Sequence, residues 1–221
     1  MASWMVHLRV ADNLINKFNN LSVEDFIVGN IGPDCGEPNE TWTEFTPPKE
    51  ITHWKSGKDE KTISPELFYN NYFGEKNNDI KKFSFYIGYY VHLLTDVQWY
   101  KDILLPTKEK FKDEFLRDSN YEVFERIKGD WYDLDHLFIK ENKDFYSFKI
   151  FQNLKHYNND YLEYYSVTAI PKQISYISKF YNEEQDNLYR EYIYLTEEEM
   201  NTFVKRTCNT IENVLVKKGV L

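Results

Sequence analysis

The chain has 221 residues, and its 27 Lys and Arg against 36 Asp and Glu give a formal net charge of −9. This acidic balance argues against general binding to a nucleic-acid backbone, so we expect no double-stranded nucleic acid as a partner. A hydrophobic content of 42% excludes a disordered chain, and 8 Gly with 7 Pro are too few for a turn-rich β protein, so helices are favoured from the start.

The first predicted helix covers residues 4–18. Apolar residues follow His7 at three, four, seven, eight and eleven positions, which is the spacing of one helical face. His7 is therefore expected to point into the core. A short helix over residues 22–28 begins with a Ser-x-x-Asp cap and stops at Gly29.

A long loop is predicted over residues 29–62. Prolines at positions 33, 38, 47 and 48 interrupt regular structure, but the segment is too rich in aromatic residues for a solvated linker. Long ordered loops in compact domains are usually functional. We therefore expect this loop to cover the central helix and to contribute to a site.

The most important predicted helix covers residues 79–105 and is bounded by Pro106. It follows a shorter helix over residues 65–73 and is apolar almost all round, which is typical of a helix at the centre of a fold. The remaining helices are predicted over residues 121–141, 145–154 and 161–181, with an interruption at Pro171 left open, and over 196–218, which begins with a capping box.

These elements predict an all-α fold, a multi-helix bundle around one central buried helix. The length suits a single domain over residues 1–221. Two cysteines are too few for a disulfide framework, no apolar run approaches the ~20 residues of a membrane span, and the first residues lack the features of a signal peptide. We expect a cytoplasmic protein without a membrane anchor; its oligomeric state is left open.

The central helix carries His92 and Asp96, four residues and therefore one turn apart on the same face. A buried carboxylate must be paired, hydrogen-bonded or bound to a metal. This spacing suits metal chelation. It suits equally a hydrogen-bonded His–Asp pair that ties helices together.

Three further residues have suggestive positions. His7 lies on the buried face of the first helix, Asp34 follows a Gly-Pro turn, and His53 lies in the proline-rich loop. Each alone has a plain structural explanation, as a core histidine, a capping aspartate and a loop histidine. With His92 and Asp96 they form a nitrogen and oxygen ligand set that suits zinc, without the thiolates of a structural zinc finger.

The order of these motifs resembles the zinc-dependent phospholipase C family, whose all-α fold is shared with fungal single-strand nucleases. The likeness covers roughly residues 4–102. The matching segments are His7-Leu-Arg-Val-Ala, Gly32-Pro33-Asp34, Thr52-His53-Trp54 and the stretch from Gly88 to Gln98. The resemblance implies that Asp34, His53, His92 and Asp96 hold one zinc, and that Asp96 bridges to another zinc bound by His7.

The chain departs from the family pattern in three places. Secreted members bind metal through a mature N-terminal tryptophan, and here Trp4 follows three other residues. A family histidine is replaced by Asp102. The later His-x-x-x-Glu pair is missing, and its nearest candidate is Asp133 with His136, for which metal ligation competes with a helix N-terminal charge cluster or a surface ion pair. We therefore expect two or three zinc ions.

Such a cluster suits hydrolysis of a phosphoric ester, with a small phosphate ester or a phospholipid head group as substrate. Asp34 is the candidate catalytic residue, because a carboxylate at the edge of a metal can take the proton of the attacking water. The candidates for lining the site are Trp42, Trp54, Trp99 and Tyr100.

Two alternatives remain open. The chain could be a non-catalytic helical binding or scaffold protein with a structural metal cluster. It could also be a soluble phosphodiesterase or nucleotidase rather than a lipase. Basic residues lining the site would favour nucleotides, and an exposed apolar rim would favour lipid.

Overall fold

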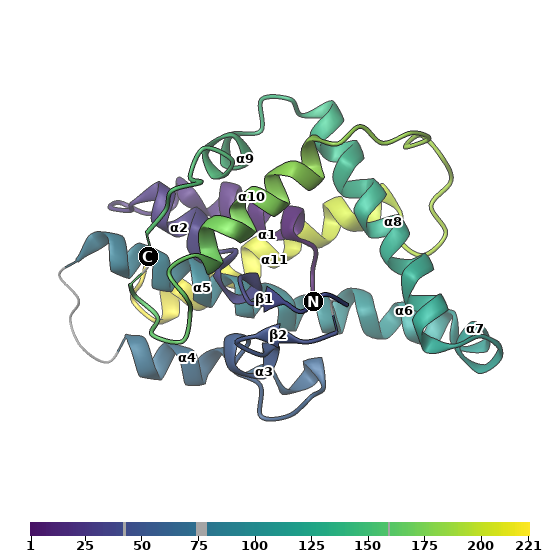
Figure 1. Ribbon diagram of the computed structural model, residues 1–221, viewed down its shortest axis with the longest axis horizontal. Helices are drawn as coiled ribbons and strands as arrows, with labels where there is room; N and C mark the ends of the chain where they lie inside the picture. Colours follow the sequence, from purple (N-terminus) through teal and green to yellow (C-terminus); the bar gives the residue numbers. More distant parts are fainter. Residues whose placement is uncertain (42, 74–78, 159) are drawn as a thin grey trace.

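The computed structural model describes residues 1–221 except 42, 74–78 and 159 (Figure 1). Helices dominate the described chain and confirm the all-α prediction. They are α1 (Trp4–Ile15), α2 (Val23–Gly29), α3 (Lys49–Thr52), α4 (Pro65–Tyr72), α5 (Ile80–Trp99), α6 (Leu105–Lys110), α7 (Lys112–Arg117), α8 (Asn120–Glu141), α9 (Tyr146–Phe151), α10 (Ala169–Asn182) and α11 (Glu197–Lys217). Two short strands, β1 (Glu37–Pro38) and β2 (Phe45–Thr46), pair antiparallel.

Helix α5 is the central element of the described fold. It packs against α1, α2, α4 and α11, and its middle turns are buried on every side. Helices α6 and α7 extend to one end of the molecule, from which α8 returns across it (Figure 1). No helix in the described ranges is long and apolar enough to span a bilayer.

Helices α2 and α5 approach each other through two glycines. A Cβ on Gly88 would lie 2.2 Å from the carbonyl oxygen of Phe26, and a Cβ on Gly29 would lie 2.2 Å from that of Phe85. Both distances are far inside van der Waals contact, so any larger residue would push the helices apart. Asn30 is the residue that follows α2. The close approach brings it against α5 at His92, which lies one turn after Gly88.

The predicted end of the central helix at residue 105 is wrong. Regular α-helix ends at Trp99, a π-helical turn covers Tyr100–Leu104, and α6 continues the chain with Pro106 in its first turn. A proline in a first turn costs little, because its missing N–H would have no partner within the helix. Pro106 therefore starts a helix rather than ending one.

Two other boundaries also differ from the prediction. The helix expected over residues 161–181 begins only at Ala169, and Pro171 lies in its first turn instead of interrupting it. The expected loop over residues 29–62 contains β1, β2 and α3, and Pro48 stands at the N-cap of α3. The prolines of this segment delimit short elements rather than preventing them.

The glycine contact makes a direct prediction about stability. We expect Gly88→Ala to lower the free energy of unfolding by about 3 kcal/mol, because the new Cβ would overlap backbone atoms that cannot move alone. Thermal and denaturant unfolding of the purified variant would measure this loss.

Gly129→Ala is the matched control. Gly129 also lies inside a long helix, α8, but a Cβ there would meet nothing within 4 Å. This variant should gain about 0.5–1 kcal/mol from higher helix propensity. Equal effects of the two substitutions would show that the α2–α5 approach is not a steric constraint.

Candidate metal centre

The five candidate ligands of the sequence analysis lie together beside the middle of α5. The Nε2 atom of His92 is 3.3 Å from Oδ2 of Asp96, and Nε2 of His53 is 3.6 Å from the same oxygen. The other oxygen, Oδ1 of Asp96, is 3.5 Å from Nε2 of His7. Asp34 contacts the cluster through its Oδ1 atom, which is 3.4 Å from Nε2 of His53. Helix α1, the turn after α2, the end of α3 and helix α5 thus contribute to one cluster.

The ligand atoms form two groups that share His92. One contains His7, His92 and Asp96, and the other contains Asp34, His53 and His92; within each, the atoms lie within 4.8 Å of one another. The rings of His7 and His92 stack with centroids 3.6 Å apart, and Nε2 of His53 is 3.4 Å from Nε2 of His92. Three imidazoles and two carboxylates therefore converge within the space of one or two ions.

Several of these polar atoms have no partner of their own. Both ring nitrogens of His7 and Oδ2 of Asp96 are buried without a hydrogen-bond partner among the described residues. All three histidine side chains are 0% exposed. Leaving such groups unsatisfied costs about 1–3 kcal/mol each. A divalent cation between them would satisfy Oδ2 of Asp96 and Nε2 of His7, the ring nitrogen that faces Asp96, so the residues present fit a metal.

The surrounding structure orients two of the three imidazoles, those of His92 and His53. The carbonyl oxygen of Asn30 can only accept, so His92 donates Nδ1–H to it at 2.7 Å and presents Nε2 to the cluster. Nδ1 of His53 lies 2.9 Å from the hydroxyl of Thr52, whose carbonyl in turn accepts from the Tyr89 hydroxyl. Contacts of this kind orient metal-ligating histidines.

The turn that carries Asp34 is held against α5 by close packing. A Cβ on Gly32 would lie 2.8 Å from the ring of Tyr89, and the Tyr165 hydroxyl donates to the Gly32 carbonyl at 2.6 Å. The 3-10 turn Gly32–Asp34 therefore has a fixed position relative to the central helix. This explains why the Gly-Pro turn of the sequence presents its aspartate to the cluster.

Burial and mutual charge set the protonation of the cluster. Burial lowers the pKa of His7 to about 4 and also lowers the pKa of His53. Burial opposes a charge on His92 as well, but Asp96 and Asp34 outweigh it and raise the pKa of His92 above its usual 6.5. Burial likewise disfavours charge on the two carboxylates, yet the neighbouring imidazoles hold both pKa values below the usual range. Both carboxylates are thus ionised at neutral pH.

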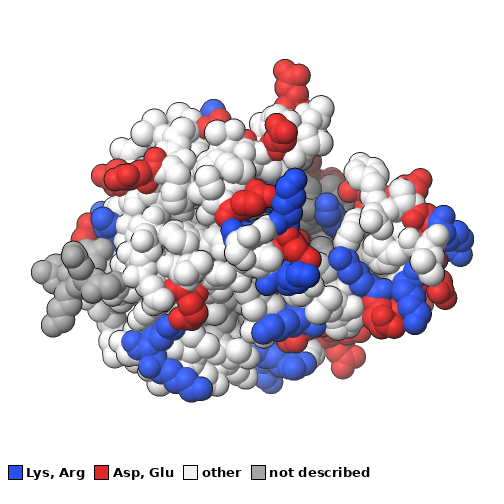
Figure 2. Space-filling model, turned by 90° about the horizontal axis from the view of Figure 1, so that it is seen from below, with Lys and Arg blue, Asp and Glu red and all other residues white. Residues whose placement is uncertain are grey.

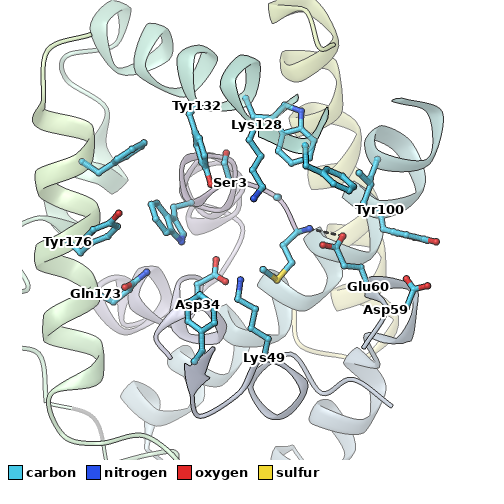
Figure 3. A pocket seen from close by; sticks show the side chains of 18 of the residues that line it. Ser3, Asp34, Lys49, Asp59, Glu60, Tyr100, Lys128, Tyr132, Gln173 and Tyr176 are labelled. Carbon is cyan, nitrogen blue, oxygen red and sulfur yellow. Dashed lines mark ion pairs between the residues drawn. The ribbon is translucent and has the colours of Figure 1, made fainter. Parts of the chain in front are cut away.

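Asp34 is the one residue of the cluster that also faces a large cavity. The cavity has a volume of about 600 Å³, and Asp34 is the sole member of the five among its described lining residues. Figure 3 shows the Asp34 side chain pointing into this space beside Lys49, with Lys128 and Tyr132 entering from α8 on the opposite side. A ligand in the cavity would therefore meet the cluster through Asp34.

The three later candidate ligands lie outside this cluster. Asp133 forms an ion pair with Arg190 at 2.7 Å. His136 packs against the ring of Phe180, and Asp102 lies 4.0 Å from Arg206. Among the described residues, none of the three belongs to a group of three or more candidate ligands.

Three of the four aromatic residues expected to line the site are described, and of these three only Tyr100 lines the cavity. Trp99 is completely buried against Trp131 and Phe203, which corrects its assignment. Trp54 packs on the rings of α4 instead of lining the cavity. Trp42 lies outside the described residues.

One contact of the cluster could not be found from the sequence. The backbone N–H of Ala2 donates to Oδ1 of Asp96 at 2.7 Å. Backbone contacts leave no residue-type signal in a sequence. Trp4, the nearest match to the family's N-terminal tryptophan, packs in α1 against the rings of Tyr132, Tyr176 and Phe180.

The comparison with protein families agrees with this geometry. A family model described as zinc dependent phospholipase C matches residues 6–213. The chain belongs to this family. No curated protein and no solved structure matches the chain in the corresponding comparisons. The family match extends from α1 into α11, so membership of the zinc-dependent phospholipase C family includes the segments beyond residue 102, where the motif resemblance ended.

Loss of one shared ligand should remove the metal. We expect His92→Ala to purify with less zinc and to melt at a lower temperature, because His92 belongs to both ligand groups. His156→Ala is the control, since His156 is exposed and outside the cluster. Elemental analysis and thermal melting measure the two effects. A chelated, metal-free wild type that melts like the untreated protein would contradict a stabilising metal.

The raised pKa of His92 sets the direction of a pH effect. In the metal-free protein His92 keeps its proton above pH 6.5, and zinc must displace that proton. Zinc affinity should therefore fall as pH decreases through the pKa of His92, by about tenfold per pH unit when one proton is displaced. His7 has a pKa of about 4, so it is already neutral near pH 7 and does not contribute to this pH dependence of zinc affinity. Chelator competition at several pH values would measure this; affinity independent of pH from 6 to 8 would contradict it.

Proposed function

We propose that this chain is a zinc-dependent hydrolase of phosphoric esters with a phospholipase C-like reaction. The observation that carries the proposal is the position of Asp34, which belongs to the buried ligand cluster and lines the adjoining cavity. Membership of the zinc-dependent phospholipase C family supports the same reaction class. The substrate proposed is a small phosphate ester or a phospholipid head group, and the compartment proposed is the cytoplasm.

The proposed ligand sets divide the five residues around a shared Asp96. Asp34, His53, His92 and Asp96 would hold one zinc, and His7 would hold a second together with Asp96. The two oxygens of Asp96 support a bridging role, because Oδ2 faces His92 and His53 whereas Oδ1 faces His7. We propose two ions, since the candidates for a third site lie elsewhere.

The chain's own groups have distinct tasks in this reaction. Zinc bound here would polarise the phosphate and lower the pKa of the attacking water to near neutrality. Asp34 is ionised at neutral pH, so its carboxylate can accept a hydrogen bond from the attacking water and orient it toward a phosphate in the cavity. Asn30 and Thr52 keep the imidazoles of His92 and His53 in place.

A non-catalytic scaffold with a structural metal cluster is the main alternative. A purely structural site would have every ligand enclosed and no access from a cavity. His7, His53, His92 and Asp96 meet that description, but the Asp34 side chain is 8% exposed and lines the cavity. Access to the cluster from the cavity therefore supports the enzyme over the scaffold.

Asp34→Asn separates the two functions. Asparagine keeps the size and one coordinating oxygen but loses the negative charge that orients water. We expect turnover of a chromogenic phosphodiester to fall by about 10²-fold or more, while most of the zinc and the fold remain. Steady-state kinetics, elemental analysis and circular dichroism together measure these outcomes.

Asp144→Asn is the matched control, because Asp144 is an exposed aspartate whose partner is Lys149 at the surface. Its turnover should equal that of the wild type. Equal turnover in wild type and Asp34→Asn would mean that a contaminating hydrolase is being measured. No turnover in any form, across metals and pH 6 to 9, would favour the scaffold.

A further inference from the structure

Three lysines surround the cavity that Asp34 enters. Lys49 is the first residue of α3, Lys108 lies in α6 and Lys128 lies in α8, so the three approach from separate elements. Figure 2 shows Lys and Arg side chains around a hollow on this face of the molecule, with Asp and Glu side chains among them. In Figure 3 the amines of Lys49 and Lys128 point into the cavity from opposite sides.

These lysines are weakly engaged by the rest of the protein. The shortest ion pair that any of them makes with a described carboxylate is 3.9 Å, between Lys128 and Glu125. The Lys49 amine lies 4.5 Å from the centroid of the Phe45 ring, and the Lys108 amine lies 5.2 Å from that of Phe124. Cations held over aromatic rings keep their charge and most of their hydrogen-bonding capacity.

Two of the three acidic residues that line the cavity have partners outside this set of lysines. Glu60 contacts the Met1 amine at 2.8 Å, and Asp59 contacts Lys61 at 3.4 Å and caps its own turn. Both therefore have cationic or backbone partners of their own. In a chain with a net charge of −9, the described lining of this cavity carries three lysines and the Met1 amine against Asp34, Asp59 and Glu60, a formal charge of +1. Such a rim raises the local concentration of anionic ligands.

Three aromatic residues of the cavity pack against one another. The ring of Trp4 touches those of Tyr176 and Phe180 edge-on, with centroids 5.8 Å apart in both pairs. These rings provide an apolar wall, against which the uncharged part of a substrate can lie.

We propose that this cavity selects phosphoric esters that carry a second phosphate group, held by Lys49 and Lys128, over zwitterionic phosphocholine esters. This rests on the proposed hydrolysis at Asp34. The scissile phosphate lies at Asp34, and the second phosphate extends into the cavity between the two lysines. Two charge-assisted contacts from opposite sides would fix its position. The lysines are specificity residues; the zinc ligands and Asp34 remain the hydrolytic groups.

Three p-nitrophenyl phosphodiesters test this selectivity directly. They differ only in the second ester group, which is ethyl, choline or 2-phosphoethyl. We expect kcat/KM of the zinc-loaded protein to be highest for the 2-phosphoethyl ester. The double variant Lys49→Ala/Lys128→Ala should lose roughly 10-fold on that ester and little on the ethyl ester.

Two further variants separate recognition from general damage. Lys49→Arg/Lys128→Arg should restore the preference, because arginine keeps the charge and binds phosphate. Lys143→Ala removes an exposed lysine outside the cavity and should change nothing. Equal rates on the three esters in the wild type, or a preference for choline, would overturn the proposal, as would an unchanged preference in the double alanine variant.

Binding to Asp34→Asn keeps this test independent of turnover. Calorimetry with the same three esters should give the tightest binding for the 2-phosphoethyl ester, and Lys49→Ala/Lys128→Ala in that background should abolish the difference. If the wild type hydrolyses none of the esters but this binding preference holds, the proposed function fails and the lysine site stands. If the esters are hydrolysed and bound without preference, the lysine site fails and the function stands.

Vesicles identify the source of the second phosphate. Phosphatidylcholine vesicles with and without a lipid that carries a phosphorylated head group are compared with the soluble 2-phosphoethyl ester. Release of diacylglycerol only from the phosphorylated lipid would support the site with a lipid as substrate. Turnover of the soluble ester alone would support it with a free phosphate ester as substrate. Faster release from pure phosphatidylcholine would contradict it.

Discussion

The close approach of α2 and α5 at Gly29 and Gly88 is the contact on which the candidate site depends. Because neither glycine has a Cβ, the end of α2 reaches the backbone of α5. Asn30 then accepts a hydrogen bond from His92, and the turn that follows places Asp34 beside the central helix. A steric constraint between two backbones thus determines which nitrogen the shared histidine offers and where the one cavity-facing carboxylate lies.

The buried cluster created by this packing is electrostatically incomplete without a cation. It combines two ionised carboxylates with imidazoles, two of which burial keeps neutral, and several of its buried atoms lack partners among the described residues. Burying such groups is costly unless they are paired or coordinate a metal. Zinc suits nitrogen and oxygen ligands of this kind, in agreement with the zinc-dependent phospholipase C family to which the chain belongs. The protein therefore keeps a costly arrangement that a bound ion would stabilise.

Much of the centre was predictable because its residues obey local rules. Helical spacing placed His7 on a buried face and His92 one turn from Asp96, and both positions are as expected. Packing that depends on partners distant in the sequence was not predictable. Proline signals misplaced the helix ends near Pro106 and Pro171, because a proline in a first turn and a proline after a helix leave the same local pattern. The lysines around the cavity come from three elements, so no single segment revealed them.

X-ray absorption at the zinc edge of the purified protein tests the central claim most directly. The account predicts a first shell of nitrogen and oxygen atoms at about 2.0–2.1 Å with the outer scattering of imidazole rings, and no sulfur. Cys35 lies next to Asp34 in the sequence, so a shifted site would bring a thiolate within reach. A zinc–sulfur distance near 2.3 Å, or a shell without imidazole, would contradict a metal centre built from these histidines and aspartates.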